Sequence, residues 1–151
     1  VGEGRDEARL RNLAADLNVM DRVGFAGAMR DDELPEAYAT STIYLDASRP
    51  APDSTGDGHA ISLFEAASAG LPIVVSDSRR ARPVVRHGAN GLVLEPADPT
   101  AIAGAIASLL RDADSRREMG ILGRESVEAD LNWNRVAQDT ARFVRECVAN
   151  G

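Results

Sequence analysis

Two acidic residues, Asp57 and Glu65, flank the predicted start of a helix in the middle of the chain. A loop rich in Pro, Ser, Asp and Gly (residues 48–58) precedes this helix, which we expect to span residues 60–69. The first N–H groups of a helix attract anions, and a glycine-bearing loop lets a ligand approach the backbone. Such an arrangement suits a ligand with both phosphates and hydroxyl groups, such as a nucleotide sugar. These residues alone leave a second interpretation equally possible, in which Asp57 is only a charge at the helix terminus and Glu65 is a solvated helix residue with no function.

Two predicted strands surround this helix. Residues 42–46 form a β-branched and aromatic run before it, and residues 71–77 form an apolar run after it. Gly70 should end the helix, and Pro72 should prevent it from continuing. Because ligands of parallel α/β sheets bind outside the carboxyl ends of the strands, we expect the acids at that edge. We expect these residues on the inward face of the helix: Ile61, Phe64, Ala67 and Ser68.

The remaining elements are predicted from hydrophobic spacing and capping residues. We expect a helix over residues 5–18 ending at Asn18, a short strand at 23–25, and a brief helix from Asp31 or Asp32 to Tyr38. A turn at residues 88–91 leads to a strand at 92–94. Three helices complete the chain. The first has Asp98 as its cap and Pro99 as its first residue, and its inward face consists of Ile102, Ile106, Leu109 and Leu110. The second spans residues 115–129, and the third is capped by Asn132 and carries a stripe of Trp133, Val136, Thr140, Phe143, Val144 and Cys147.

Composition excludes several classes of function. The 151 residues are 44% hydrophobic, which suits one domain with its own core. The net charge of −7 makes nucleic acid an unsuitable partner. A single cysteine, Cys147, leaves no disulfide framework and fits the reducing cytoplasm, where we expect the protein. No apolar run reaches the roughly 20 residues that cross a bilayer. We find no signal peptide, and no spacing of His, Cys and acids suited to a metal.

The central segment resembles the acidic signature (Glu, seven residues, Glu, then Ala) of the C-terminal domain of retaining GT-B glycosyltransferases of the group-1, or family-four, class. Asp57 and Glu65 hold the two acidic positions. The resemblance covers nearly the whole chain, and its strength lies in the order and spacing of weak motifs: 2–4 (GEG), 21–27 (DRVGFAG), 47–48 (AS), 65–66 (EA), 69–74 (AGLPIV), 88–93 (GANGLV), 98–99 (DP) and 132–133 (NW). It implies an α/β, Rossmann-like parallel sheet flanked by helices.

The resemblance also implies roles for individual residues. Asp57 would be the catalytic acid that contacts the donor sugar hydroxyls, and Glu65 would hold the nucleotide ribose, since a carboxylate suits a vicinal diol. Backbone N–H groups would line the diphosphate at Gly58, His59, Ala60, Ile61 and Ser62, and the donor would also be contacted at Gly2, Gly4 and Gly27. No cofactor or metal is implied, because the nucleoside-diphosphate sugar is a substrate.

One segment departs from the family pattern. Arg79 and Arg80 occupy positions where the family usually has a Gly-Gly pair, and Pro83 stands where it usually has Glu. These arginines are either a solvated turn or cations directed at a diphosphate or an anionic acceptor. The glycines that would let the backbone approach the donor are therefore absent from positions 79 and 80.

The chain begins at Val1, and we expect it to be one partial domain (residues 1–151) of a longer protein. The family sheet has the doubly wound order 3-2-1-4-5-6. Residues 23–25, 42–46, 73–76 and 92–94 would be strands three to six, so strands four, five and six should form a contiguous parallel core. The first strand–helix unit, with its phosphate-binding Arg and Lys, would precede Val1; the chain contains no lysine. The acceptor would bind a missing N-terminal domain, through which peripheral membrane association is open, and the fragment alone should be inactive.

Two other functions remain open at this stage. A sugar-nucleotide epimerase shares the GT-B architecture but relies on further acids and a histidine that we cannot place. A non-catalytic nucleotide-binding or interaction module of the same fold is favoured by Arg79 and Arg80, and by Asp in place of Glu at position 57.

Overall fold

The computed structural model describes residues 1–47, 61–76, 81, 84–95, 98–130 and 132–149. The chain forms two compact units, Val1–Ala37 and Tyr38–Gly151. The second unit contains the sheet and Glu65.

The first unit contains the helix α1 (Glu7–Asp16) and the 3-10 turn η1 (Met20–Arg22). The prediction of Asn18 at the end of α1 is confirmed, because Asn18 has a φ of 55°, in the left-handed region that Asn tolerates. Its N–H donates to the carbonyl of Ala15 at 2.9 Å, and the N–H of Val19 donates to Ala14 at 2.9 Å. This pair of hydrogen bonds closes the last turn of the helix.

The strand predicted at residues 23–25 is wrong for the described structure. Val23 has extended backbone angles, but residues 23–25 belong to no strand. A strand is defined by a ladder of hydrogen bonds to a neighbour. Near this segment we find a backbone bond from the Gly2 N–H to the Gly27 carbonyl at 2.6 Å, which does not make a ladder. Extended backbone without a paired neighbour therefore accounts for the error.

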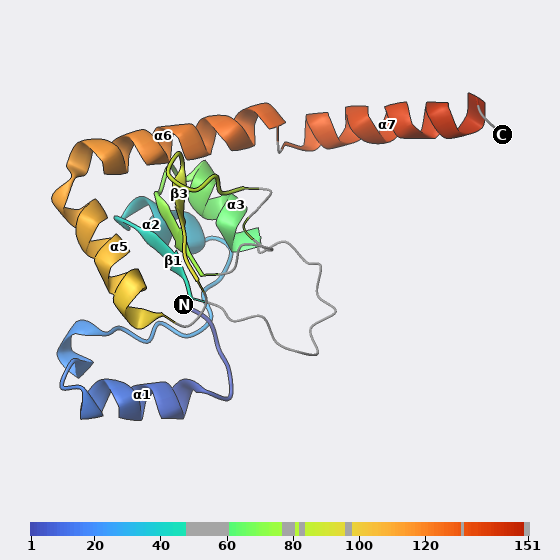
Figure 1. The fold of residues 1–151 in the computed structure, drawn as a ribbon. Helices are drawn as coiled ribbons and strands as arrows, with labels where there is room; N and C mark the ends of the chain where they lie inside the picture. The colour runs from blue at the N-terminus through green and yellow to red at the C-terminus, as the bar shows by residue number, and fades with distance from the viewer. Residues whose placement is uncertain (48–60, 77–80, 82–83, 96–97, 131, 150–151) are drawn as a thin grey trace. The chain divides into compact units, whose positions relative to one another are not determined.

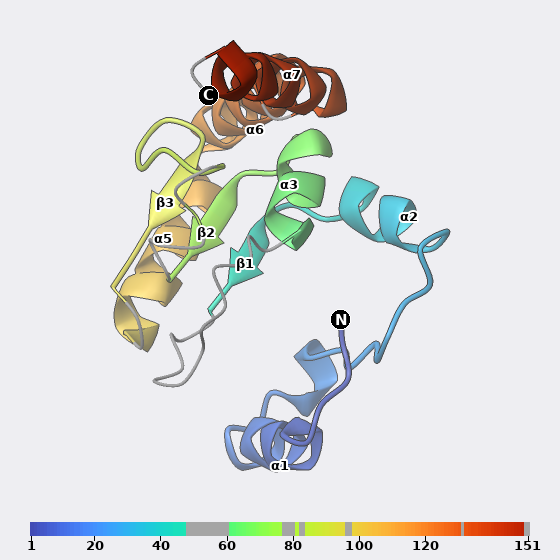
Figure 2. The same cartoon turned by 90° about the vertical axis from the view of Figure 1, so that its right-hand side faces the viewer.

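The second unit is built on a parallel sheet of β1 (Tyr44–Asp46), β2 (Ile73–Val75) and β3 (Gly91–Val93). The strands lie in the order β1-β2-β3, with Leu45 opposite Val74 and Val74 opposite Leu92. Figure 2 shows the three strands side by side. The predicted α/β class and the contiguous three-strand parallel core are both confirmed.

Helices cover both faces of this sheet. The helix α3 (Ile61–Ser68) lies on one side and α5 (Pro99–Arg111) on the other (Figure 1). Between the sheet and α3 lies a continuous apolar core, which consists of Leu63, Ala66, Ala67, Leu71, Ile73, Val75, Ala81, Val84 and Val85. The central strand β2 is entirely buried and apolar, as expected for a strand covered on both faces, whereas β1 and β3 are only partly buried.

The predicted inward face of α3 is partly wrong. Leu63, Ala66 and Ala67 are buried, whereas Ile61 is 73% exposed. Ser68 is also exposed. Leu63, Ala66 and Ala67 are spaced i, i+3 and i+4, so they share one face of the helix. Ile61 lies two residues from Leu63, about 200° around the helix, and therefore points away from that face.

The end of α3 has the geometry that Gly70 was expected to provide. Gly70 has a φ of 75°. Its N–H donates to Ala67 at 2.9 Å, and the N–H of Leu71 donates to Ala66 at 3.0 Å, as in a Schellman motif. The long helix α6 (Ala113–Asp130) packs against this end of α3. Arg124 Nε of α6 donates to the Ser68 carbonyl at 2.9 Å and satisfies one of the free carbonyls at the helix terminus.

The start of α5 confirms the predicted cap. The Asp98 carboxylate accepts hydrogen bonds from the N–H groups of Thr100 and Ala101, each at 3.0 Å, and Pro99 is the first helical residue. Leu109 is buried as predicted. Leu110 is 56% exposed, so its predicted inward orientation is wrong. It follows Leu109 by about 100° of helical rotation, which turns it out of the packed face.

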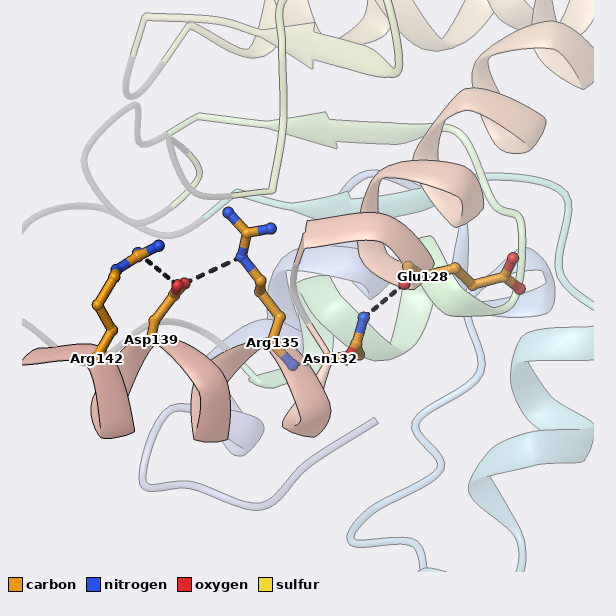
Figure 3. A network of polar contacts seen from close by, with 5 residues as sticks. All are labelled: Glu128, Asn132, Arg135, Asp139 and Arg142. Atoms are coloured by element: carbon orange, nitrogen blue, oxygen red, sulfur yellow. Dashed lines mark hydrogen bonds and ion pairs between the residues drawn. The ribbon is translucent and has the colours of Figure 1, made fainter.

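The last helix, α7 (Trp133–Ala149), begins at the predicted cap, Asn132. The Asn132 Oδ1 accepts from the Arg135 N–H at 3.0 Å, and its Nδ2 donates to the Glu128 carbonyl of α6 at 2.6 Å (Figure 3). On α7, Asp139 is paired with Arg135 at 3.1 Å and with Arg142 at 2.6 Å. The predicted stripe of α7 is exposed within this chain, with Trp133 87% exposed, and Cys147 is exposed with it.

Candidate functional site

The topology places the first half of α3 at the carboxyl edge of the sheet. The chain leaves β1 at Asp46, enters α3 at Ile61 and reaches the start of β2 at Ile73. Because β1 and β2 are parallel, α3 must run back along the sheet from the carboxyl ends of the strands to their amino ends. Glu65 is in the middle of the helix, one turn after its start. It is half-buried, and not a solvated surface residue.

A tyrosine fixes the carboxylate of Glu65. The helix α2 (Leu34–Ala39) precedes β1, and Tyr38 lies near its end. The Tyr38 hydroxyl donates a hydrogen bond of 2.8 Å to Oε2 of Glu65. Both residues belong to the second unit, although 27 positions of sequence separate them. The carboxylate therefore has one oxygen bound to the protein.

The ring of Tyr38 is itself held in place. Its centroid lies 6.2 Å from that of Tyr44 on β1, with the ring planes tilted by 41°. Both tyrosines pack against the apolar core beneath α3. Burial and, after it, the hydrogen bond to Glu65 raise the pKa of the Tyr38 hydroxyl well above its ordinary value of 10.0. The hydroxyl thus stays protonated, and stays a hydrogen-bond donor, at neutral pH.

Sequence reasoning missed Tyr38 as a functional residue. It was expected only as the last residue of a short helix, and it does lie near the end of α2. No local spacing connects a residue of α2 to one of α3. The available signal was the chemistry of tyrosine itself, because a buried tyrosine ring usually needs a partner for its hydroxyl.

Several predicted site residues lie outside the described residues. These are Asp57, Gly58, His59 and Ala60 of the acidic motif, and Arg79, Arg80 and Pro83 of the segment that departs from the family pattern. The convergence of Asp57 and Glu65 on one site therefore stays a prediction. Ile61 and Ser62 are described and form the first turn of α3, where Ile61 is exposed and Ser62 half-buried. The first N–H groups of a helix have no partners within the helix, so this turn is suited to an anion.

The three predicted glycines of the N-terminal segment share one hollow of the first unit. It measures about 420 Å³ and is lined by Gly2, Gly4, Gly27 and neighbouring residues that include Phe25 and Leu10. Gly2 and Gly27 have φ values of 120° and 67°, which side chains rarely tolerate. A Cβ atom at any of the three would meet nothing within 4 Å. The backbone around these glycines is therefore open to a ligand.

The described residues also bear on two other classes of site. Among them, no group of three or more His, Cys, Asp or Glu side chains could hold a metal ion. None of the described helices combines the length and the apolar character needed to span a bilayer.

The fold and the position of Glu65 define an α/β, Rossmann-like domain with an acidic residue on the helix that follows its first strand. The chain belongs to the glycosyl transferases group 1 family, whose model matches residues 1–126. The resemblance noted from the sequence is thereby confirmed.

Two curated relatives illustrate the similarity. The chain is 36% identical over 146 residues to a GDP-mannose-dependent alpha-(1-6)-phosphatidylinositol monomannoside mannosyltransferase of Mycobacterium tuberculosis, an alignment that covers 96% of this chain and 38% of that protein. It is 32% identical over 151 residues to a phosphatidyl-myo-inositol mannosyltransferase of Mycobacterium leprae, covering 100% of this chain and 38% of that protein. The chain thus spans less than half the length of these relatives.

Solved structures agree in fold. A sucrose-phosphate synthase from Thermosynechococcus elongatus superposes with a TM-score of 0.82 at 28% identity, over 98% of this chain and 36% of that one. Anabaena HepE, solved in complex with UDP, superposes with a TM-score of 0.79 at 21% identity, over 92% of this chain and 36% of that one. The second likeness shows the fold alone.

Proposed function

We propose that this chain is the donor-binding part of a glycosyltransferase, which transfers a hexose from a nucleoside-diphosphate sugar to an acceptor bound elsewhere in a longer protein. Glu65 binds the ribose hydroxyls, the first turn of α3 with Gly58–Ser62 binds the diphosphate, and Asp57 contacts the donor sugar. Gly2, Gly4 and Gly27 add backbone contacts to the donor. The donor to test first is GDP-mannose, because a relative at 36% identity is named as dependent on it.

One observation carries this proposal more than any other. Glu65, the acid that matches the ribose-binding position of the family signature, is half-buried and held by the Tyr38 hydroxyl at 2.8 Å. Withdrawing a carboxylate from water has a free-energy cost, which is unexpected for an acid with no function on a helix surface. A carboxylate with an oxygen directed at a ligand diol recovers that cost through charge-assisted hydrogen bonds.

The test is calorimetric titration of the full-length parent protein with GDP-mannose, UDP-glucose, GDP and UDP. Replacing Glu65 with Ala should weaken binding of the preferred ligand by about 1.5–3 kcal/mol, the scale of hydrogen bonds to a charged group. That range corresponds to roughly 10- to 150-fold in Kd. The matched control is Glu118→Ala, which removes the same side chain from an exposed position on α6 and should leave Kd unchanged.

Two results would contradict the proposal. A parent protein that binds none of the four ligands is not a nucleotide-sugar enzyme of this kind. Equal effects of Glu65→Ala and Glu118→Ala would remove Glu65 from the ribose site, and would leave its partial burial to be explained by packing alone.

Two finer features belong to the same proposal. Transfer retains the anomeric configuration of the donor, which NMR of the freshly formed product would test. Donor binding requires no metal, since backbone N–H groups and arginines supply the positive potential at the diphosphate. Titration with EDTA and with added Mg²⁺ should therefore give the same Kd. A tenfold difference between the two titrations would refute metal-independent binding.

A non-catalytic module of the same fold is the second candidate. Its support is the sequence around Arg79, Arg80 and Pro83, which departs from the family pattern. The two candidates differ in one measurement on the parent protein. A module would bind nucleoside diphosphates but neither hydrolyse nor transfer the sugar of any donor, whereas an enzyme would release the nucleoside diphosphate when an acceptor is present.

A further inference from the structure

The partner of Glu65 on α2 has a consequence for how a ligand would be recognised. Tyr38 donates to Oε2 of Glu65 at 2.8 Å, and within the described part of the chain this is the only hydrogen bond of the carboxylate, so Oε1 and the second lone pair of Oε2 can bind a ligand. A free glutamate side chain samples several rotamers, and ordering it on binding has an entropic cost. A carboxylate already fixed by a hydrogen bond avoids much of that cost.

The surroundings of Tyr38 are built to hold its hydroxyl at one place. The ring lies against Tyr44 and against the core beneath α3, so that its direction is set by packing. Tyrosine has only two side-chain torsions ahead of its hydroxyl, both of which this packing restricts. The raised pKa of the Tyr38 hydroxyl keeps it protonated, and therefore a hydrogen-bond donor, at neutral pH. The hydrogen bond therefore has a fixed donor and a charged acceptor, which makes it stronger than a neutral one.

We propose that Tyr38 is a positioning residue for ribose recognition: it orients the Glu65 carboxylate so that the two ribose hydroxyls are bound together. This inference rests on the proposed function of Glu65. A purely structural role, in which the bond only joins α2 to α3, is the competing explanation. The two differ in ligand selectivity, because a structural role affects all ligands alike.

The test uses the full-length parent protein with GDP and UDP, each beside its 2′,3′-dideoxy form. Tyr38→Phe removes only the hydroxyl. It should weaken binding of the preferred ribonucleotide by about 3- to 10-fold, the scale of one hydrogen bond, and that of the dideoxy form by less than twofold. The matched control is Ser108→Ala, which removes a hydroxyl that bonds to the Ala105 carbonyl at an exposed position on α5 and should leave both affinities within twofold of wild type.

A double-mutant cycle separates positioning from packing. If Tyr38 acts through the carboxylate, Tyr38→Phe should have no further effect on ribonucleotide affinity in a Glu65→Ala background. Thermal unfolding of each variant checks that the fold is kept. A wild-type protein that binds neither ribonucleotide would refute the proposed function, and this inference with it. The positioning role alone would be refuted if Tyr38→Phe left unchanged the ratio of the affinities for the ribonucleotide and its dideoxy form. Equal losses of affinity for both forms would give that result.

Discussion

The close approach of α6 to the end of α3 makes Gly120 the most demanding position in the described core. A Cβ atom placed on Gly120 would overlap the carbonyl oxygen of Gly70 and lie 2.9 Å from its carbonyl carbon. Both of these atoms are backbone, so no side chain can rotate to make room. Gly70 cannot easily shift, because its left-handed backbone (φ of 75°) and the hydrogen bond from its N–H to Ala67 are both part of the turn that ends α3. Gly120→Ala must therefore push α6 away from the turn.

The size of the effect follows from two opposing contributions. Alanine is favoured over glycine in a helix interior by about 1 kcal/mol. Overpacking of a well-packed contact typically costs about 1–3 kcal/mol, and displacing α6 also lengthens the Arg124–Ser68 hydrogen bond, worth about 0.5–1.5 kcal/mol. Together these contributions lead us to expect that Gly120→Ala lowers the free energy of unfolding by about 0.5–3.5 kcal/mol, because backbone overlap outweighs helix propensity.

Two other helical glycines provide matched controls for the same substitution. A Cβ at Gly104 of α5 meets nothing within 4 Å, and one at Gly123 of α6 makes ordinary contacts of 3.8 Å with Ala67. Both alanine variants should gain about 0.5–1 kcal/mol from helix propensity alone. Urea unfolding followed by circular dichroism would compare the midpoints of the three variants with wild type. If Gly120→Ala is as stable as Gly104→Ala, the close packing of α6 on the Gly70 turn is absent in solution and the reasoning fails.

Two further substitutions test buried and exposed polar contacts. Asn90→Ala should lower the free energy of unfolding by about 2–3 kcal/mol, because the buried Asn90 amide donates to Val84 at 2.8 Å and accepts from the Arg86 N–H at 2.6 Å; a loss below 0.5 kcal/mol in urea unfolding would contradict this. Asp112→Ala should reduce stability most at neutral pH. The N–H and hydroxyl of Ser115 lower the pKa of the Asp112 carboxyl below its ordinary value of 3.8, so its contribution is present above that value and is lost as pH falls through the lowered pKa. The difference in unfolding midpoint between wild type and variant should shrink on acidification, and a difference that does not depend on pH would contradict the assignment.

The parts of the fold that were predicted correctly rest on local chemistry. Asp98 caps a helix because its carboxylate reaches two N–H groups that follow it directly. Asn18 and Gly70 end helices because they tolerate positive φ. The three core strands follow from short β-branched, aromatic and apolar runs, of which the central one, β2, is buried throughout. Each of these signals involves residues within a few positions of one another.

The parts that could not be predicted depend on contacts between distant residues. Helical spacing limits which residues share a face, but Ile61 and Leu63 are both large and apolar, and only the packed sheet selects Leu63. The resemblance identified Glu65, yet its partner Tyr38 lies 27 residues earlier on another helix. The predicted strand at 23–25 had suitable composition but no paired neighbour in the described structure. Composition indicates that a segment can be extended or buried, and tertiary contacts decide whether it is.

Under the proposed function, the middle and the C-terminal end of α3 have different tasks. At its C-terminal end, the Arg124 hydrogen bond to Ser68 and the contact of Gly120 with the Gly70 turn fix the helix to α6. One turn after its start, Glu65 is held by Tyr38 alone among the polar contacts described for its carboxylate. A helix anchored firmly at its C-terminal end can present a side chain near its middle with little motion, because a short helix moves as a rigid element. Under the proposed function, stability and ligand recognition thus fall to different residues of the same eight-residue helix, and substitutions at Glu65 and at the C-terminal end can be interpreted separately.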